Sequence, residues 1–158
     1  MKRPGYQVCL LLGSNVRPET NLPLAVARLR RELTVLQASS VWESPPVGGG
    51  GPDYLNAALL AVSHTGVLSL KQGTLLPLEA RLGRVRTSDK NSPRPIDLDI
   101  ILFDGQVLDP TLWQYAHRAV PVSEVLPGLR SEDGETLKDM AFRLAAVQSL
   151  RLRTDVAL

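Results

Sequence analysis

The stretch IDLDIILF at residues 96–103 is the strongest strand signal in the chain. Successive side chains of a strand point to opposite faces of its sheet, so Asp97 and Asp99 share one face, about 6.5 to 7 Å apart at Cα. The other face is expected to carry the apolar even-numbered positions: Ile96, Leu98, Ile100 and Leu102. The stretch therefore predicts a strand that packs on a core while it presents two carboxylates together.

Three further strands are expected before this one, at residues 6–12, 39–43 and 54–63. The first is a continuous apolar run, which is typical of a strand buried on both faces. The second runs into Pro45 and Pro46, which have no N–H to donate and so end ladder pairing. The second and third strands are expected to form a hairpin whose long loop contains the glycine-rich run 48–51.

Two helices are expected to alternate with these strands. Thr20 or Asn21 can cap the first, whose apolar residues keep helical spacing: Leu22, Val26, Leu29, Leu33 and Leu36. The second covers residues 67–82 but contains Gly73 and Pro77, so a kinked or interrupted helix is expected.

The predicted order of elements is β, α, β, β, α, β. This is the pattern of a ferredoxin-like split βαβ, an α+β sandwich with helices on one face of an antiparallel sheet. Between the second helix and the last strand, residues 84–95 form a polar loop. Asp104-Gly105 suits a tight turn into Val107-Leu108, and a closing helix is expected over residues 134–150.

Composition bounds the class of protein. A chain of 158 residues, 44% hydrophobic and 22% charged, is expected to form a single globular domain, residues 1–158. It contains no apolar run of the roughly 20 residues that a membrane span needs, so a cytoplasmic protein is expected. The balance of 18 Lys+Arg against 16 Asp+Glu is too even for a general nucleic-acid binder. The single cysteine, Cys9, excludes a disulfide scaffold and is expected in the core.

Asp97 and Asp99 are the first candidates for chemistry. Two carboxylates on one face repel each other, and a hard cation such as Mg²⁺, bound through phosphate oxygens, relieves this repulsion. The alternative is that the pair is solvated or forms salt bridges with arginines. Basic side chains crowd the preceding segment and fit either a metal-bound polyphosphate or structural ion pairs: Arg81, Arg84, Arg86 and Arg94.

Other positions allow two interpretations. Glu79 could accept a hydrogen bond from a ligand or could pair with Arg81 or Arg84. Tyr54 and Asn56 share a strand face and could present an aromatic wall and an amide to a flat heterocycle, or could belong to the core.

Short motifs narrow the chemistry further. Gly13-Ser14-Asn15 could approach a ligand closely or form a plain turn. The run 48–51 lacks the Lys-Ser/Thr of a phosphate-binding loop and is expected to be a flexible flap. His64 and His117 have no partners at metal-ligand or triad spacing, so neither a covalent nor a zinc mechanism is supported.

The chain resembles the 6-hydroxymethyl-7,8-dihydropterin pyrophosphokinase family of folate biosynthesis. The resemblance covers most of residues 6–108 and continues in PVSEVLPGL at 121–129. It is carried by four segments: LLGSN at 11–15, SPPVGGGGPDYLNAA at 44–58, LEARLGRVR at 78–86 and the highly specific SPRPIDLDIILF at 92–103. It implies transfer of the β,γ-pyrophosphoryl group of ATP to the pterin hydroxymethyl group, releasing AMP, with two Mg²⁺ ions.

The resemblance also implies residue roles. The metal ligands would be Asp97 and Asp99, which join the arginines in the catalytic set: Arg84, Arg86, Arg94, Asp97 and Asp99. ATP would contact Glu79, Arg84, Arg94 and Ile100. The pterin pocket would consist of Gly13, Ser44, Pro45, Pro46, Val47, Tyr54 and Asn56. Such a displacement needs positioning and charge neutralisation but no protein nucleophile. A monomer that binds only small molecules is expected, with no nucleic-acid or membrane partner.

The sequence departs from the family in two regions. Asn91 stands where the family often has an aromatic residue, and Leu76 lies where it has a nucleotide-contacting glutamine. The segment between Phe103 and Pro121 is shorter than usual. Only three residues there could replace the later ATP contacts and the aromatic that covers the pterin: Tyr115, His117 and Arg118.

Two other functions are alternatives. One is a non-catalytic ligand-binding or regulatory module on the same scaffold, which would explain the shortened segment. The other is a different DxD metal enzyme, such as a nucleotide-sugar transferase, for whose usual nucleotide-binding domain 158 residues leave little room.

Overall fold

A computed structural model describes residues 4–158, whose centre is one seven-stranded sheet. All neighbouring strands pair antiparallel, in the order β6-β5-β1-β4-β3-β7, and β2 also pairs with β4. The strands are β1 (Tyr6–Ser14), β2 (Thr34–Ala38), β3 (Trp42–Ser44), β4 (Tyr54–Ser63), β5 (Asp97–Phe103), β6 (Gln106–Val107) and β7 (Arg151–Leu152).

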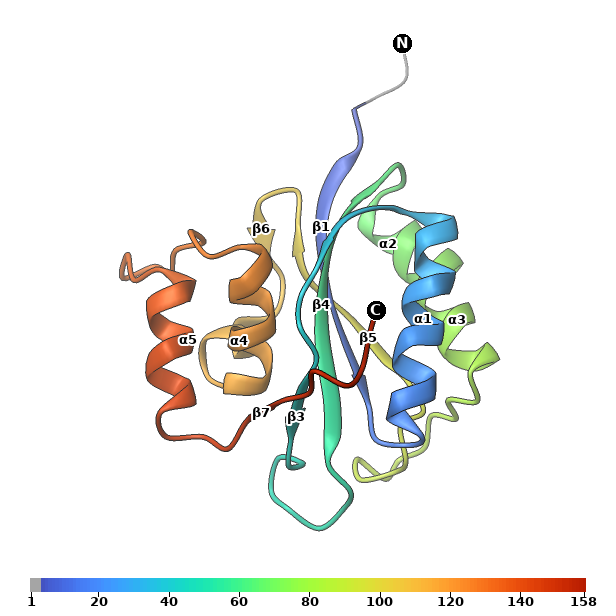
Figure 1. The fold of residues 1–158 in the computed structure, drawn as a ribbon. Coiled ribbons are helices and arrows are strands. Elements are labelled where there is room, and N and C mark those ends of the chain that lie inside the picture. The colour runs from blue at the N-terminus through green and yellow to red at the C-terminus, as the bar shows by residue number, and fades with distance from the viewer. Residues whose placement is uncertain (1–3) are drawn as a thin grey trace.

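Helices cover both faces of this sheet (Figure 1). One face carries α1 (Pro18–Glu32), α2 (Val67–Leu70) and α3 (Leu76–Arg81), and the other carries α4 (Ala116–Val125) and α5 (Leu137–Ala145). The α+β class and the antiparallel sheet are confirmed, whereas the expectation of helices on one face only is wrong. Within residues 4–158, no helix has the length and apolar character needed to cross a membrane.

Strand β1 supplies both apolar layers. Val8, Leu10 and Leu12 pack in the cluster beneath α1, while Cys9 and Leu11 pack in the cluster beneath α4 and α5. This two-sided burial explains why the run is apolar at every position, and it confirms the sequence prediction. Burial raises the pKa of the Cys9 thiol to about 12, as expected for a core residue.

Strand β5 contains a β-bulge that changes the predicted alternation. Cys9 of β1 faces Leu102 and Leu10 faces Ile100, so Ile101 is an extra residue between them. Ile101 and Leu102 both pack in the cluster beneath α4. The expectation that Leu102 would share a face with the earlier even-numbered positions is therefore wrong.

Helix α1 ends earlier than predicted, at Glu32. Leu36, which was expected on its apolar face, lies in β2 and is exposed. The expected strand over residues 39–43 is likewise wrong, because two strands, β2 and β3, flank a break between Ala38 and Trp42. Thr34 and Val35 follow the helix after Leu33, and β-branched residues favour strands over helices.

The start of α1 also differs from the prediction. Arg17 occupies the N-cap position in a left-handed conformation, with φ of 41°, and Pro18 follows in the first turn. Neither Thr20 nor Asn21 is the cap. Asn21 is instead inside the helix, buried, and its Nδ2 donates to the carbonyl of Val16 at 2.6 Å.

The second helical region is interrupted, as predicted. A π-helical stretch, Lys71–Leu75, separates α2 from α3. Pro77 lies in the first turn of α3 and has no N–H to donate to the carbonyl of Gly73. The π-helical stretch has the form in which π-helices mostly occur, a short turn within an α-helical segment.

The region after β5 was only partly predicted. Asp104 and Gly105 adopt φ of 49° and 83°, which confirms a tight turn, and β6 follows. A 3₁₀ helix (Pro110–Trp113) and α4 were not predicted. Helix α5 is shorter than the expected 134–150 because Thr136 caps it, accepting from the Asp139 N–H at 3.2 Å.

The last residues cross the sheet edge from the α5 side to the α1 side (Figure 1). Strand β7 pairs with β3, and Glu43 receives ion pairs from Arg151 and Arg153, both at 2.6 Å. Val156 and Leu158 then pack against the apolar cluster beneath α1. This segment, which was not predicted, holds β3 in place beside the residues described next.

Candidate active site

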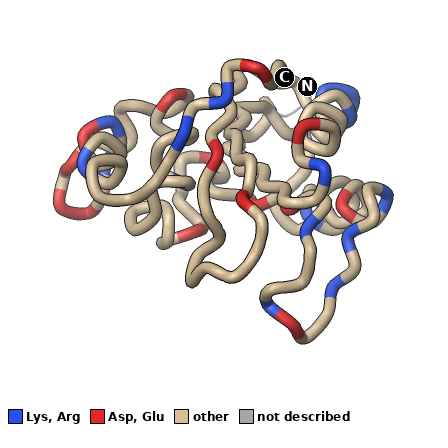
Figure 2. Tube along the Cα trace, turned by 60° about the horizontal axis from the view of Figure 1, so that its bottom comes forward, with Lys and Arg blue, Asp and Glu red and all other residues tan. Residues whose placement is uncertain are grey.

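Two long loops leave the same end of the sheet and flank a cavity of about 400 Å³. The glycine-rich loop joins β3 to β4, and the loop of residues 84–95 enters β5. Figure 2 shows that the glycine-rich loop carries no basic residue, whereas the loop of residues 84–95 carries several. The cavity therefore has one neutral wall and one strongly charged wall.

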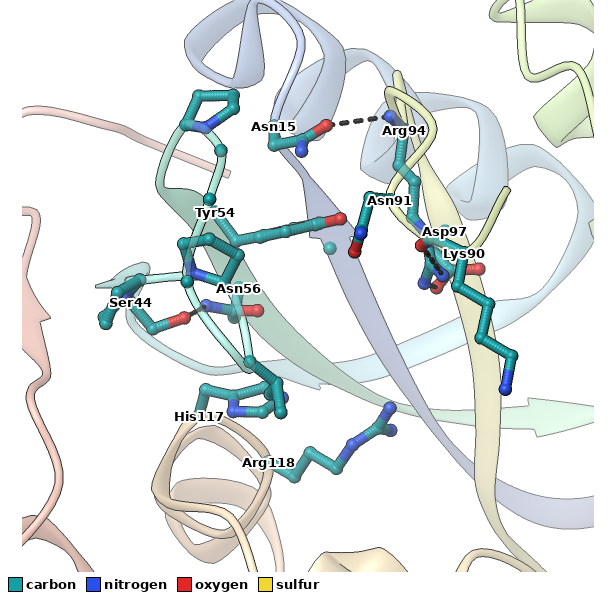
Figure 3. A pocket seen from close by; sticks show the side chains of 18 of the residues that line it. Asn15, Ser44, Tyr54, Asn56, Lys90, Asn91, Arg94, Asp97, His117 and Arg118 are labelled. Carbon is teal, nitrogen blue, oxygen red and sulfur yellow. Dashed lines mark hydrogen bonds and ion pairs between the residues drawn. The ribbon is translucent and has the colours of Figure 1, made fainter.

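Asn56 organises the neutral wall. Its buried amide nitrogen donates to Ser44 Oγ at 2.8 Å and to the Trp42 carbonyl at 3.1 Å. Both amide hydrogens are thereby used, and Oδ1, which accepts no hydrogen bond from residues 4–158, points into the cavity (Figure 3). The ring of Tyr54, two residues earlier on β4, lies beside it. This wall offers an aromatic face and a hydrogen-bond acceptor.

Gly13 keeps the floor of the cavity open. On β1 it pairs with Asn56 on one side and with Asp97 on the other. A Cβ atom at this position would stand 3.7 Å from both Asn56 Oδ1 and Tyr54 Cδ1. A side chain here would occupy the space into which the acceptor and the aromatic ring face.

Ion pairs hold the carboxylates of the charged wall. Asp97 binds Nη1 of Arg84 through Oδ1 and Nη1 of Arg94 through Oδ2, both at 2.9 Å. Asp99 pairs with Arg118 of α4 at 3.3 Å. The acidic pair is therefore salt-bridged in this structure, as one interpretation of the sequence predicted. Arginines reach the two carboxylates from two places, the loop of residues 84–95 and helix α4.

The acidic pair is also suited to a divalent cation. Burial first, and then the charge of Asp97, raise the pKa of Asp99, although Arg118 opposes both effects. Within residues 4–158, no third histidine, cysteine or acid completes a metal cluster around them. A site with two carboxylates and open positions fits Mg²⁺, which keeps water and takes phosphate oxygens as its other ligands.

Glu79 lies outside the cavity and fastens the charged loop to β5. It is buried on α3, where Oε1 accepts from the Leu98 N–H at 2.8 Å and Oε2 accepts from Arg86 Nη2 at 2.7 Å. Its partner is thus Arg86 and not Arg81 or Arg84. Burial raises the pKa of Glu79, although both hydrogen bonds oppose this effect.

Asn15 tethers the other end of the same loop. Its Oδ1 accepts from the Arg94 N–H at 2.8 Å, and its own N–H donates to the Arg94 carbonyl at 3.0 Å. Ser14 Oγ donates to the Pro95 carbonyl at 2.6 Å. The Gly13-Ser14-Asn15 motif at the end of β1 therefore positions the loop.

Most of the residues singled out from the sequence meet at the cavity: Gly13, Ser44, Pro45, Pro46, Val47, Tyr54, Asn56, Arg94, Asp97 and Asp99. Four do not line it. Arg84 lies behind Asp97, Arg86 and Glu79 pair with each other, and Ile100 packs with the α1 cluster on the opposite face of β5 from Asp97.

The cavity is also lined by Asn15, Lys90, Asn91, His117 and Arg118. From the sequence, Asn15 is a candidate for close approach to a ligand, and His117 and Arg118 are candidate replacements for ATP contacts and for the pterin cover. Lys90 and Asn91 lie in the polar loop that the sequence marked. His117 and Arg118 lie in the shortened segment, and nothing in its pattern indicates which way they point. Burial first, and then Arg118, lower the pKa of His117 to about 4, so its imidazole is neutral at pH 7.

The chain is similar in sequence to known proteins. The family model for 7,8-dihydro-6-hydroxymethylpterin-pyrophosphokinase (HPPK) matches residues 9–127. The chain is 30% identical over 146 residues to the 2-amino-4-hydroxy-6-hydroxymethyldihydropteridine pyrophosphokinase of Pseudomonas aeruginosa, covering 85% of this chain and 89% of the relative. It is 30% identical over 135 residues to the Bacillus subtilis protein of the same name, covering 78% of this chain and 80% of the relative.

A solved structure supports the fold alone. The wild-type HPPK-DHPS of Plasmodium falciparum, crystallised with pteroate, aligns with a TM-score of 0.66 at 10% identity. The alignment covers 92% of this chain but only 44% of the Plasmodium chain. The chain therefore spans less than half the length of that structural relative.

Proposed function

This chain belongs to the 7,8-dihydro-6-hydroxymethylpterin-pyrophosphokinase family, and we propose from this premise how its cavity serves the family's reaction. That reaction transfers pyrophosphate from ATP to the hydroxymethyl group of 6-hydroxymethyl-7,8-dihydropterin in folate biosynthesis, giving AMP and the pterin diphosphate. The observation that carries the proposal is the continuity of one cavity, from a heterocycle-sized neutral wall to an acidic pair flanked by arginines.

The pterin binds against the neutral wall. The cavity volume of about 400 Å³ lies within the range of about 300–1,000 Å³ typical of small-molecule sites. The ring of Tyr54 covers one face of the heterocycle, and Asn56 Oδ1 accepts from one of its N–H groups. The rest of the pocket is formed by Gly13, Ser44, Pro45, Pro46 and Val47.

ATP places its triphosphate against the charged wall. Arg94 lines the cavity and binds phosphate oxygens, which guanidinium groups hold in a two-pronged geometry, while Arg84 and Arg86 support the wall through Asp97 and Glu79. The resemblance implies contacts of Glu79 and Ile100 with the adenosine part of ATP, but both residues lie outside the cavity, on α3 and on the opposite face of β5. Asp97 and Asp99 hold two Mg²⁺ ions, and the chemistry these ions supply is neutralisation and orientation of the phosphate charge.

The residues of the chain align the two reactants and stabilise charge. The pterin hydroxyl oxygen bonds to the β-phosphorus and loses its proton, while the bond from that phosphorus to the α,β-bridging oxygen breaks and AMP leaves. Arg94 faces the charge that develops during this in-line displacement, and Arg84 holds Asp97 from behind. No nucleophilic side chain is needed, because the cavity holds the pterin hydroxyl and the β-phosphorus close together and the hydroxyl attacks directly.

The proposal extends to the context of the enzyme. Residues 1–158 act as a single pyrophosphokinase domain, which works as a cytoplasmic monomer on small molecules. Neither nucleic acid nor a membrane is a partner, and the near balance of 18 basic and 16 acidic residues supports this.

The decisive experiment incubates the purified chain with ATP, Mg²⁺ and 6-hydroxymethyl-7,8-dihydropterin and resolves the nucleotide products. AMP should form only when all three are present, with controls that omit the pterin or chelate the metal. Formation of ADP would show transfer of a single phosphoryl group and contradict the proposed reaction. Pterin binding without any turnover would favour a non-catalytic module.

A further inference from the structure

Arg118 reaches the acidic pair from α4 rather than from the arginine-rich loop. Its Nη1 lies 2.8 Å from Asp109 Oδ2 and 3.3 Å from Asp99 Oδ2, so one nitrogen bridges two carboxylates. Figure 3 shows the guanidinium extending from α4 across the cavity toward the strand that carries Asp97. The side chain of Arg118 thus lies between the carboxylates of Asp99 and Asp109, and it comes from α4 and not from the loop of residues 84–95.

The two contacts are unequal. Asp109 is itself fixed, because its Oδ1 accepts from the N–H and Oγ1 of Thr111 at 2.9 and 2.6 Å, where the 3₁₀ helix begins. Asp99 makes the longer contact, and its side chain is 40% exposed against 23% for Asp109. Asp109 is therefore the anchor of Arg118, and Asp99 is the partner that it can release.

The remaining donors of Arg118 are available to a ligand. Its Nε and Nη2 make no hydrogen bond with any of residues 4–158, and the side chain lines the cavity. A cation bound to Asp99 would repel the guanidinium, whereas phosphate oxygens would attract it. A metal that arrives with a nucleotide satisfies both groups at once, and a metal that arrives alone does not.

We propose that Arg118 is a counter-ion that Asp99 exchanges for a divalent cation, and that the freed guanidinium, still held by Asp109, then binds the nucleotide phosphates. The inference rests on the proposed function, since it takes Asp99 as a metal ligand and ATP as the nucleotide. It makes Arg118 a residue that disfavours free Mg²⁺ and favours the Mg²⁺-nucleotide complex. A purely structural ion pair would also disfavour free Mg²⁺, but it would not favour the Mg²⁺-nucleotide complex.

The test measures two affinities of the full chain by titration calorimetry. One probe is Mg²⁺ alone, and the other is Mg²⁺ with α,β-methylene-ATP, in which carbon replaces the bridging oxygen at the bond that breaks. In Arg118→Gln the affinity for Mg²⁺ alone should rise about fivefold and that for the analogue complex should fall about tenfold, within the usual range of coupling between two ligands.

Two variants serve as controls. Arg118→Lys keeps the charge but loses the fork, so its affinity for Mg²⁺ alone should stay near that of the unmodified chain, while analogue binding should weaken less than in Arg118→Gln. Arg143→Gln removes an arginine that pairs with Glu135 at 2.9 Å outside the cavity, and it should change neither affinity. Thermal unfolding of each variant shows that the fold is retained.

A higher affinity for Mg²⁺ alone together with a lower affinity for the analogue complex, in Arg118→Gln, supports the exchange. Shifts in the same direction, or no shift, would overturn it, and so would a failure of the unmodified chain to bind the analogue. The AMP assay on the unmodified chain is read separately. AMP release without opposite shifts leaves the proposed reaction standing and refutes the role of Arg118, whereas opposite shifts without AMP release support the exchange and refute the reaction.

Discussion

Replacing Asp97 by alanine should lower the free energy of unfolding by about 3 kcal/mol. The carboxylate is 17% exposed and neutralises Arg84, which is 9% exposed, and Arg94, which is 29% exposed. Removing one partner of a buried ion pair costs about 3–5 kcal/mol, because the other charge stays buried and unpaired. The more exposed Arg94 pair adds less than about 1 kcal/mol. Because Asp97 itself is partly solvated, the total loss in the free energy of unfolding should fall near about 3 kcal/mol, the lower end of the range for a buried pair.

The loss can be measured as a shift in the unfolding temperature. For a chain of 158 residues, 1 kcal/mol corresponds to about 2–4 °C, so Asp97→Ala should unfold about 9 °C below the unmodified chain. Asp97→Asn keeps one oxygen acceptor for Arg84 and should lose about half as much. Circular dichroism during heating and urea denaturation would give both values, and AMP release, measured in parallel, should be lost in both variants.

A double variant isolates the buried charge. Arg84→Met combined with Asp97→Ala removes the unpaired guanidinium, so it should be more stable than Asp97→Ala alone. An unfolding temperature of Asp97→Ala within about 1 °C of the unmodified chain would refute this reasoning, because Arg84 would then not depend on its carboxylate.

Three further variants test the cavity. The pKa of His117 is about 4 in the folded chain, against 6.5 for an ordinary histidine, so as the pH falls this residue is protonated in the unfolded chain before it is protonated in the folded one. The contribution of His117 to the free energy of unfolding should be complete above pH 6.5 and should decline toward pH 4, with a loss of about 2 kcal/mol at pH 5. Urea titrations at several pH values should show this decline for the unmodified chain but not for His117→Gln. If His117→Gln shows the same decline, another group causes it. Gly13→Ala places a methyl group 3.7 Å from Tyr54 and Asn56, so pterin binding, followed by fluorescence, should weaken about tenfold while binding of the ATP analogue stays constant. Asn56→Ala leaves buried Ser44 without its amide donor and should cost about 2 kcal/mol in urea denaturation, whereas a loss below about 0.5 kcal/mol would contradict the role of the amide.

The positions of the acidic pair and of the loop arginines followed from local rules. Asp97 and Asp99 share a face because both precede the bulge at Ile101, where simple alternation still holds. The loop arginines meet Asp97 because the chain itself delivers them, within about a dozen residues, to the start of that strand. These features needed no knowledge of distant contacts.

The α4 side of the site could not be predicted in this way. The segment that forms α4 contains Pro121 in its interior, where proline removes a hydrogen bond, so its pattern is not that of a helix. It is helical because its apolar residues are buried against β4 and α5. The direction of Arg118 depends on this packing, and the bulge at Ile101 depends on the pairing of β5 with β1. Tertiary contacts decided each of these features.

The loop of residues 84–95 is fastened by polar contacts, and its apolar residue, Val85, is exposed. Its order therefore depends on direct hydrogen bonds and ion pairs, and dissolved salt screens buried pairs much less than exposed charges. The apolar layers on either side of the sheet have no such dependence. The largely buried pair of Arg84 with Asp97 and the pair of Arg86 with the buried Glu79 should therefore keep the loop fastened across physiological ionic strength.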